Sequence, residues 1–404
     1  MRLYFWLLHL VAFFGHKKAR MMVKGQKNVF GELKEWRSTV PACEVVWFHA
    51  ASVGEFEQAR PIIEKLYSQR TDVRILLTFY SPSGYEMRKN YPNAHKVTYL
   101  PFATQKNAKK FLEIVKPSMA VFIKYEFWPA YLKALHKNHI PTYIIAATFR
   151  PKQLFFQPWG KGYRNLLKCF TCLYVQSKES LQLLQQYGIN HVEVAGDTRF
   201  DRVQQIADQA QPIPVIEDFV QKNNGKKVIV AGSTWAEDEM LLARFLQQHE
   251  DVVLILVPHE VNVEHLREIF QTFHGRFVRY TEATPANIGM CRVLMIDTLG
   301  MLSRIYQYAD TAYIGGGFGV GIHNTLEAAV YGTPVIFGPH YHKFREAKGL
   351  IQAGAAKSVH DYDTFAQAMT EALEQKQTMG QCAKDYVISE LGATEYIFNK
   401  LFCK

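Results

Sequence analysis

The stretch that decides the fold is TAYIGGGFGVGIHNTLEAAVYGTPVIFGPHYHKF, residues 311–344. Its apolar runs at 311–314 and 335–337 predict two buried strands, with a helix opening near Asn324 between them. The glycine loop 315–321 leaves the backbone open to a ligand, and a helix behind such a loop directs N–H groups and a positive dipole end toward an anion. The pattern therefore predicts a strand–helix–strand unit that binds a phosphorylated ligand.

This loop matches neither of the two common phosphate-binding fingerprints. Counted from Gly315 and Gly317, Val320 stands where G-x-G-x-x-G requires its last glycine. No Lys followed by Ser or Thr completes a P-loop. The loop predicts a phosphorylated ligand without identifying it.

Length and composition indicate an ordinary globular protein of two domains. A chain of 404 residues, 48% hydrophobic and 21% charged, is long enough for two full cores. Residues 1–40 hold eight Lys or Arg and two Glu, so +6 of the net charge of +10 lies there. We therefore expect no chain-wide nucleic-acid surface, and no nucleic-acid-binding motif is present.

The N-terminal run LYFWLLHLVAFF, residues 3–14, is followed at once by a basic cluster. Twelve helical residues reach about 18 Å, against roughly 30 Å of hydrocarbon, so a full crossing is not expected. No signal-peptide cleavage site follows. We predict that residues 1–24 form a membrane-associating helix, peripheral or monotopic, on the anionic cytoplasmic face of the inner membrane. The alternative is a core helix of a soluble domain.

The remaining chain alternates strands with helices, which predicts parallel sheets wound on both faces. A Gln-rich, Pro-containing stretch at 204–225 breaks the rhythm and marks the domain boundary. We predict an α/β fold of two facing Rossmann-like domains, 25–208 and 209–380, with ligands in the cleft at the carboxyl ends of the strands. A C-terminal helix, 381–404, is expected to pack across both domains.

Three charged residues follow predicted strands of the first half and are candidates for chemistry. Glu55 opens a helix after one strand and Glu126 ends another. Either carboxylate is suited to accept a proton, but Glu55 also suits a plain role in complementing the helix dipole. Arg199, between Asp197 and Asp201, is either a fixed charge for a phosphate or a local ion pair.

In the second half, Asn324 and Glu327 have the spacing of a capping box. They serve the helix, or Glu327 accepts hydrogen bonds from ribose hydroxyls of a bound nucleotide. The histidines 323, 340 and 342 lack nearby carboxylates, so no metal site is predicted. Cys169 and Cys172 form a single C-x-x-C, which lacks the four ligands of zinc and predicts inert thiols in a reducing compartment.

Several separated motifs together resemble the Kdo (3-deoxy-D-manno-octulosonic acid) transferases of lipid A assembly, which are inverting glycosyltransferases of the GT-B fold. The motifs are HAASVGE at 49–55, EFWP at 126–129, GDTRFD at 196–201, AGST at 231–234 and GIHNTLE at 321–327. The resemblance implies transfer of Kdo from CMP-Kdo to a lipid A precursor of the lipid IV-A type at the inner membrane. It implies no metal and no cofactor, since CMP-Kdo is a substrate.

The resemblance also implies roles for individual residues. Glu55 matches the general base that deprotonates the acceptor hydroxyl, and Glu126 and Arg199 match positions that support the transition state. The implied CMP or donor-binding residues belong to the second half and are Ser233, Thr234, Pro258, His259, Gly300, Met301, Leu302, Asn324, Thr325, Leu326 and Glu327.

Four positions depart from the family pattern. His259 replaces an Arg, Met301 a Glu, Arg199 a Lys and Ala103 an Asp. They bear on donor binding more than on the reaction class. Two other functions stay open on the sequence: a different GT-B nucleotide-sugar transferase or epimerase, and a membrane-tethered protein that binds a nucleotide ligand without turnover.

Overall fold

The computed structural model describes residues 11, 13–40 and 42–403. The chain divides into two compact units: unit 1 comprises Met1–Arg202 and Leu391–Lys404, and unit 2 comprises Val203–Glu390. The chain thus leaves unit 1 inside a helix, and its last residues return to unit 1. The predicted domain ranges 25–208, 209–380 and 381–404 place these boundaries differently.

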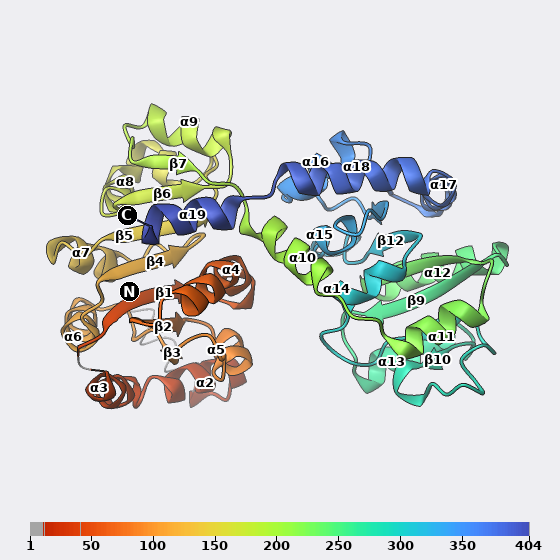
Figure 1. Ribbon diagram of the computed structural model, residues 1–404, viewed down its shortest axis with the longest axis horizontal. Helices are drawn as coiled ribbons and strands as arrows, with labels where there is room; N and C mark the ends of the chain where they lie inside the picture. The colour runs from red at the N-terminus through yellow and green to blue at the C-terminus, as the bar shows by residue number, and fades with distance from the viewer. Residues whose placement is uncertain (1–10, 12, 41, 404) are drawn as a thin grey trace. The chain divides into compact units, whose positions relative to one another are not determined.

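Unit 1 is built on a seven-stranded parallel sheet with strand order β3-β2-β1-β4-β5-β6-β7 (Figure 1). Most residues of its central strands are buried on both faces, as in sheets covered by helices on either side. The strands are β1 Glu44–Ala50, β2 Val73–Phe79, β3 Lys96–Tyr99, β4 Met119–Ile123, β5 Thr142–Ala147, β6 Cys172–Val175 and β7 Val192–Val194.

Helices cover the two faces of this sheet with separate apolar clusters. One cluster gathers buried residues of α3, α6, α7, α8 and α9, and the other those of α4 and α19. The described helices are α2 Lys17–Gly25, α3 Val29–Thr39, α4 Val53–Gln69, α5 Pro82–Arg88, α6 Gln105–Val115, α7 Pro129–Lys137, α8 Lys161–Leu167, α9 Lys178–Gln186, α10 Thr198–Asp208 and α19 Ala393–Phe402, with the short turns η1 Leu154–Phe156 and η2 Pro158–Gly160.

Unit 2 repeats this architecture with strand order β10-β11-β9-β8-β12-β13-β14, also parallel. Its strands are β8 Lys227–Thr234, β9 Val252–Pro258, β10 Val278–Arg279, β11 Val293–Met295, β12 Thr311–Ile314, β13 Val335–Phe337 and β14 Ala356–Ser358. Its helices are α11 Pro214–Lys222, α12 Ala236–Gln248, α13 Val263–Thr272, α14 Leu302–Ile305, α15 Leu326–Ala329, α16 Arg345–Gln352, α17 Tyr362–Glu374 and α18 Lys376–Ser389, with the turns η3 Tyr280–Glu282 and η4 Tyr306–Tyr308. The predicted fold class is confirmed.

Two local predictions are wrong. The stretch 204–225, predicted to interrupt the strands and helices, is largely helical, because α10 and α11 occupy most of it and bury Val203, Ile216 and Phe219. The boundary between the two units lies just before it, between Arg202 and Val203. The helix predicted to open at Glu55 begins two residues earlier, at Val53, and Pro61 lies inside it. A proline inside a helix lacks the N–H for one backbone bond, and its ring crowds the carbonyl group four residues before it.

Most of the apolar N-terminal run lies outside the described residues. Of its described members, Val11, Phe13 and Phe14 are exposed by 44%, 79% and 78%. Within the part of the chain that the structure describes, no helix has the length and apolar character needed to span a membrane. The predicted membrane-associating helix of residues 1–24 stays a prediction.

Candidate active site

Both candidate carboxylates of unit 1 follow strands at its topological switch point. The chain goes from β1 to β2 on one side and later to β4 on the other, and β1 pairs with both. At such a point the flanking connections diverge and leave a crevice at the carboxyl ends of the strands. Glu55 follows β1 and Glu126 follows β4. The structure therefore places both carboxylates at the sheet edge where α/β folds bind ligands.

Glu55 is the third residue of α4, one turn after β1. Its half-buried carboxylate accepts a hydrogen bond from the Ser52 hydroxyl. Ser52 occupies the N-cap position of α4, but its side chain makes no capping bond to the helix backbone. The motif Ser-Val-Gly-Glu thus bends the chain from strand to helix and ties its serine to its glutamate. The neutral hydroxyl partner leaves this carboxylate able to accept a proton.

Glu126 is buried and belongs to a network that the sequence did not reveal. Its Oε2 lies 3.0 Å from His49 Nε2 and accepts a 2.6 Å bond from Trp128 Nε1. His49, fully buried on β1, places Nδ1 2.9 Å from Thr78 Oγ1 and 3.1 Å from the Thr78 carbonyl oxygen. Trp47 Nε1 donates to the same Thr78 hydroxyl over 2.8 Å. The network fixes the carboxylate from two sides.

The geometry puts one proton between His49 Nε2 and Glu126 Oε2. If Nδ1 donates to the Thr78 carbonyl oxygen, that proton belongs to an imidazolium or to the carboxyl group. If Nδ1 instead accepts from the Thr78 hydroxyl, Nε2 carries the proton and donates it to Glu126. In each arrangement this contact ties the Glu126 carboxyl group to a fully buried imidazole ring.

We expect His49→Phe to lower kcat by about tenfold to a hundredfold at neutral pH, because Glu126 keeps its Trp128 bond but loses the histidine. His95→Phe is the matched control, because His95 accepts a backbone N–H within the same sheet. It should keep the wild-type kcat. A wild-type kcat in His49→Phe as well, with normal thermal stability, would show that His49 serves packing alone.

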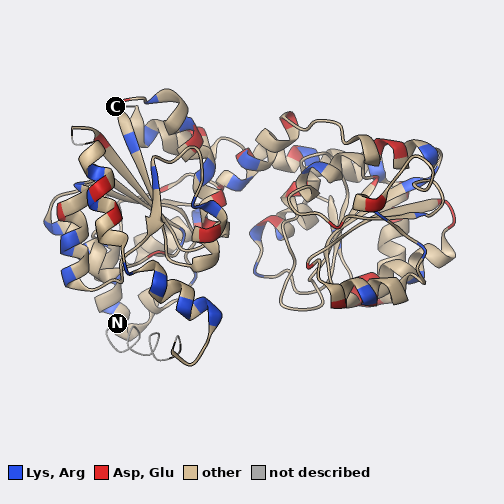
Figure 2. Cartoon of the chain, turned by 90° about the horizontal axis from the view of Figure 1, so that it is seen from below, with Lys and Arg blue, Asp and Glu red and all other residues tan. Residues whose placement is uncertain are grey.

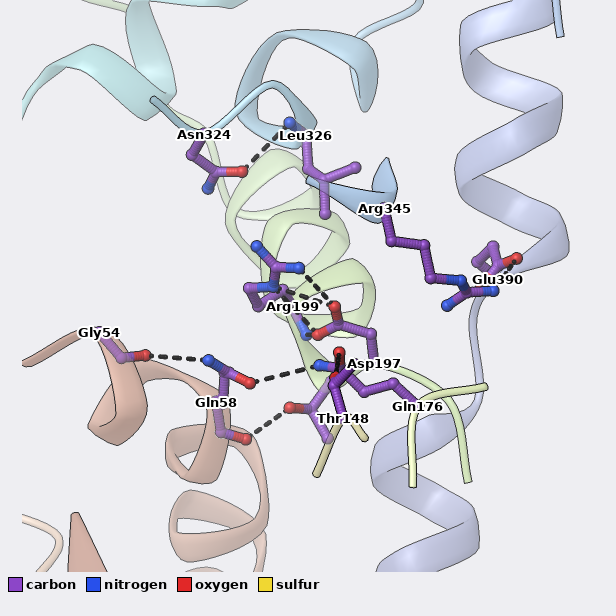
Figure 3. A network of polar contacts seen from close by, with 11 residues as sticks. Gly54, Gln58, Thr148, Gln176, Asp197, Arg199, Asn324, Leu326, Arg345 and Glu390 are labelled. Atoms are coloured by element: carbon purple, nitrogen blue, oxygen red, sulfur yellow. Dashed lines mark hydrogen bonds and ion pairs between the residues drawn. The ribbon is translucent and has the colours of Figure 1, made fainter. Parts of the chain in front are cut away.

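Arg199 forms the local ion pair that the sequence had left as one alternative. Its guanidinium donates to both carboxylate oxygens of Asp197 at 2.6–3.1 Å, and Asp197 is 2% exposed (Figure 3). The adjacent Thr198 hydroxyl donates to the carbonyl oxygen of Gln58, one turn beyond Glu55 in α4. Arg199 is thereby anchored beside the helix that carries Glu55. Its charge is largely matched by Asp197, so any charge it offers a ligand is reduced.

Asp201, the other acidic residue next to Arg199, binds the C-terminal helix. Its two carboxylate oxygens accept the backbone N–H groups of Gly392 and Thr394, each at 2.7 Å. These bonds fix the start of α19, whose Ile397 and Phe398 pack into the core of unit 1. The C-terminal helix is therefore tied to the GDTRFD motif, a link that the sequence did not reveal.

Unit 2 has its own switch point at β8, which pairs with β9 on one side and β12 on the other. The predicted donor-binding residues gather at the carboxyl ends of its strands. Ser233 and Thr234 end β8, Pro258 ends β9, and Gly300 to Leu302 follow β11. Residues 324–327 follow β12 and the glycine loop. The structure thus brings all of these groups to one edge of the sheet.

The glycine loop itself is closed by protein contacts. Gly315 N–H donates to the Gly232 carbonyl oxygen and Gly316 N–H to the buried carboxylate of Asp238. A Cβ on Gly315 would lie 2.3 Å from the Ser233 carbonyl oxygen, and one on Gly317 2.6 Å from the Gly338 backbone. The expectation that the loop is left bare for a ligand is therefore wrong at these positions. The glycines allow backbone segments to pack against each other.

The helix behind the loop, α15, is short and begins at Leu326. Asn324 Oδ1 accepts the Leu326 N–H at 3.2 Å (Figure 3). Its Nδ2 donates to Glu327 Oε1 at 3.0 Å. The expected capping role of Asn324 is thus present, one residue ahead of the formal N-cap, Thr325. The Thr325 hydroxyl is buried and has no hydrogen-bond partner among the described residues.

An aromatic stack stands at the same edge. The rings of Trp235 and His259 lie 4.7 Å apart, and those of His259 and His323 4.4 Å apart, with interplanar angles of 30° in both pairs. His259 N–H also donates to the Thr234 carbonyl oxygen at 3.0 Å. His259 is thereby held rigidly beside the end of β8. Trp235 had no signal in the sequence, because the stack depends on the pairing of β8 with β9.

Two chemistries considered on the sequence find no support in the described part of the chain. No group of three or more His, Cys, Asp or Glu side chains is placed to hold a metal there. Burial raises the pKa of the Cys169 thiol, and raises that of Cys172 to about 11. Both cysteines are free and stay protonated near neutral pH, which makes them poor nucleophiles.

Comparison with known proteins shows what unit 1 is similar to. Residues 23–202 match the family model described as 3-deoxy-D-manno-octulosonic-acid transferase (kdotransferase). This range contains β1 to β7 and the residues Glu55, Glu126 and Arg199. The chain is a homologue of the Kdo transferases.

Relatives extend the likeness beyond the range of the family model. The chain is 28% identical over 342 residues to 3-deoxy-D-manno-octulosonic acid transferase of Aquifex aeolicus, covering 82% of this chain and 87% of that one. It is 26% identical over 384 residues to the enzyme of the same name from Bordetella pertussis, covering 90% and 88%. The predicted resemblance and the predicted class, a Kdo glycosyltransferase, are confirmed.

Solved structures support the fold of this Kdo transferase homologue. The crystal structure of UDP-GlcNAc 2-epimerase from Neisseria meningitidis bound to UDP-GlcNAc matches with a TM-score of 0.64 at 16% identity, covering 89% of this chain and all of that one. At this identity the likeness concerns the architecture alone. It agrees with the predicted GT-B arrangement of two parallel-sheet units.

The departures from the family pattern have distinct settings in the Kdo transferase homologue. His259 belongs to the aromatic stack, where the family carries Arg. Met301 Sδ accepts the Thr298 hydroxyl at 3.0 Å, so its thioether is engaged within its own turn. Ala103 is 4% exposed and packs in the core of unit 1, where a charged side chain would need a partner. All three side chains are thus engaged within the unit to which they belong.

The pH dependence of unfolding tests the environment of His323. Burial, aided by the neighbouring His259, lowers the pKa of His323 from 6.5 to about 4. Between these values the unfolded chain binds a proton that the folded chain does not, so stability falls as pH falls from about 6.5 to about 4. In His323→Phe the loss of stability between pH 6.5 and pH 4 should be smaller than in the wild type. Each kcal/mol of that difference corresponds to roughly 2–4 °C in Tm. The exposed His342→Phe should keep the wild-type loss; equal curves for both variants would contradict the account.

Proposed function

We propose that this chain transfers Kdo from CMP-Kdo to a lipid A precursor with inversion, as a step in lipopolysaccharide biosynthesis. The observation that carries the proposal is Glu55. It stands at the switch-point edge of unit 1, in the family-matched range, with a hydroxyl rather than a cation as its partner. A carboxylate so placed suits the removal of a proton from an acceptor hydroxyl.

In the proposed reaction Glu55 accepts the proton of the acceptor hydroxyl while the oxygen of that hydroxyl attacks the anomeric carbon of Kdo. The bond from that carbon to the CMP phosphate oxygen breaks, and CMP leaves with the bonding electron pair. Attack on the face opposite to CMP inverts the configuration. Glu126, held by His49 and Trp128, and Arg199, held by Asp197, support the charge that develops.

Unit 2 holds the donor in this proposal. The residues at the ends of β8, β9, β11 and β12 form one polar edge, and Glu327, paired with Asn324, is positioned to accept hydrogen bonds from ribose hydroxyls. His259, whose ring stacks with those of Trp235 and His323, offers a ring N–H to the donor phosphate. CMP-Kdo is a substrate, and no metal or cofactor takes part.

A donor panel tests this assignment. Purified full-length protein is incubated in EDTA with a lipid A precursor and CMP-Kdo, UDP-GlcNAc or another sugar nucleotide, and release of free nucleotide is measured. We expect CMP release that requires the acceptor. Turnover of UDP-GlcNAc in its place would favour the epimerase-like alternative, and binding of CMP-Kdo without any turnover would favour a binding protein.

The proposal also places the protein on the cytoplasmic face of the inner membrane, as a peripheral or monotopic protein. Its lipid acceptor resides in a bilayer, and the run 3–14 with its basic neighbours suits an anionic interface. Cell fractionation tests this location. Recovery of the full chain in the supernatant at low ionic strength would oppose it.

A further inference from the structure

The positive charge of the chain is concentrated in one folded part of unit 1. Residues 105–178 hold thirteen Lys or Arg and two Glu, a net charge of +11. The whole chain carries +10, so all its other residues together carry −1. From 127 to 178 eight cations occur without one acidic residue. A segment that repels itself in this way gains from an anionic partner.

These cations belong to helices that lie side by side on one face of the sheet. α6 contacts α7, and α7 contacts α8. Lys133 and Lys137 are exposed on α7, Lys161 is exposed on α8, and Lys168 is exposed directly after α8. The charge of Lys133 acts on the Cys169 thiol, which follows α8, so cations of the two helices are neighbours. Figure 2 shows several Lys and Arg positions along the outer helices of this unit.

Exposed apolar side chains border these cations. Trp159 is 73% exposed, Tyr163 48% and Leu154 39%, all within 154–163. Beneath them, Phe155 and Phe156 are buried, and Arg164 donates to the Phe155 and Gln157 carbonyl oxygens. The exposed rings therefore project from a segment that is packed and hydrogen-bonded, not from a free loop.

We propose that this face, formed by α7, α8 and the turns η1 and η2, is a docking surface for an anionic phospholipid bilayer. Exposed Trp and Tyr beside Lys and Arg are the side chains that settle at the level of lipid headgroups. The cations add attraction to an anionic surface, which falls with salt. This contact is separate from the N-terminal run 3–14 and independent of turnover.

The alternative polyanion, a nucleic acid, fits these features less well. The exposed apolar side chains of this face are confined to one short segment, 154–163, and do not recur along α7, so they form no extended row of rings on which successive bases could stack. Bilayer binding needs such a local apolar group to enter the interface. The charge alone would serve either partner, so the position of the rings favours the membrane.

Vesicle sedimentation with the full chain tests the proposal. We compare the wild type with Lys133→Glu/Lys137→Glu/Lys161→Glu on phosphatidylcholine vesicles with and without phosphatidylglycerol. The triple variant should lose roughly tenfold or more of its partitioning to anionic vesicles. Binding to neutral vesicles, which depends on the apolar groups, should change little.

The matched control changes three exposed lysines of unit 2, Lys227→Glu/Lys348→Glu/Lys384→Glu, with the same change in net charge. It should bind anionic vesicles nearly as the wild type does. Equal losses in both variants would show a net-charge effect and overturn the proposal. The proposal would also be overturned if both triple variants bound anionic vesicles as well as the wild type does.

Fluorescence quenching locates the contact. Brominated phosphatidylglycerol should quench part of the wild-type tryptophan emission, and this part should be missing in Trp159→Phe. Quenching that survives intact in Trp159→Phe overturns the proposal, as does stronger competition by an oligonucleotide than by phosphatidylglycerol vesicles. Turnover with detergent-dispersed acceptor should be unchanged in the triple variant, so failure of docking is distinguishable from failure of the proposed reaction.

Discussion

Glu55→Gln should lower kcat by about a hundredfold to ten-thousandfold, the range usual for loss of a general base. The amide keeps the size of the side chain and can still accept the Ser52 hydroxyl bond, so the turn after β1 should stay folded. It cannot take up a proton near neutral pH. Because the residues proposed to bind the donor belong to unit 2, the Kd for CMP should be unchanged. Steady-state kinetics and calorimetric titration with CMP measure the two quantities.

The matched control is Glu179→Gln. Glu179 lies in the first turn of α9, after β6 of the same sheet, and is exposed away from the switch point. It should turn over at the wild-type rate. If Glu55→Gln also retained near-normal kcat, Glu55 would be no more than a charge at the start of a helix.

Asp238→Ala should lower the free energy of unfolding of unit 2 by roughly 3–5 kcal/mol. The Asp238 carboxylate is 1% exposed and accepts three bonds, from Tyr313 Oη at 2.6 Å, Gly316 N at 2.9 Å and Trp235 N at 3.0 Å. Alanine would leave three donors without a partner in the interior. Since one donor belongs to the glycine loop, the loop should also lose its fixed position.

Asp238→Asn separates hydrogen bonding from charge. Its amide oxygen can accept the two backbone N–H groups, and its NH2 group can donate to the Tyr313 hydroxyl, which then acts as acceptor. Burial already raises the pKa of Asp238, so loss of the charge should cost little. We expect a much smaller loss for Asn than for Ala in urea unfolding. Equal losses would show that the charge, not the set of bonds, is what the site requires.

The sequence predicted the strands well because their residues are apolar on both faces. Such a continuous apolar run can be recognised in the sequence without knowing what packs against it. The predicted strands 311–314 and 335–337 coincide with β12 and β13. The helices within 204–225 were not predicted, because its Gln and Pro residues hide the few apolar residues with which α10 and α11 bury one side of each helix. Weak amphipathic helices of this kind depend on what they pack against.

The candidate site was predictable where a residue's role follows from its place after a strand. Glu55 and Glu126 were placed in this way, and both lie at the switch point of unit 1. His49 and Asp238 were missed because their partners are far away in sequence: Glu126 is 77 residues from His49, and Gly316 is 78 from Asp238. Such contacts arise from strand pairing and have no local signature.

The central claim is that this chain moves Kdo onto a lipid A precursor, and a mass spectrum of the lipid product tests it most directly. The lipid is extracted after incubation of the wild type and Glu55→Gln with CMP-Kdo. We predict that the acceptor gains a whole number of Kdo units with the wild type and remains unmodified with the variant over the same time. An unmodified acceptor with the wild type, in a mixture that a known Kdo transferase converts, would contradict the claim.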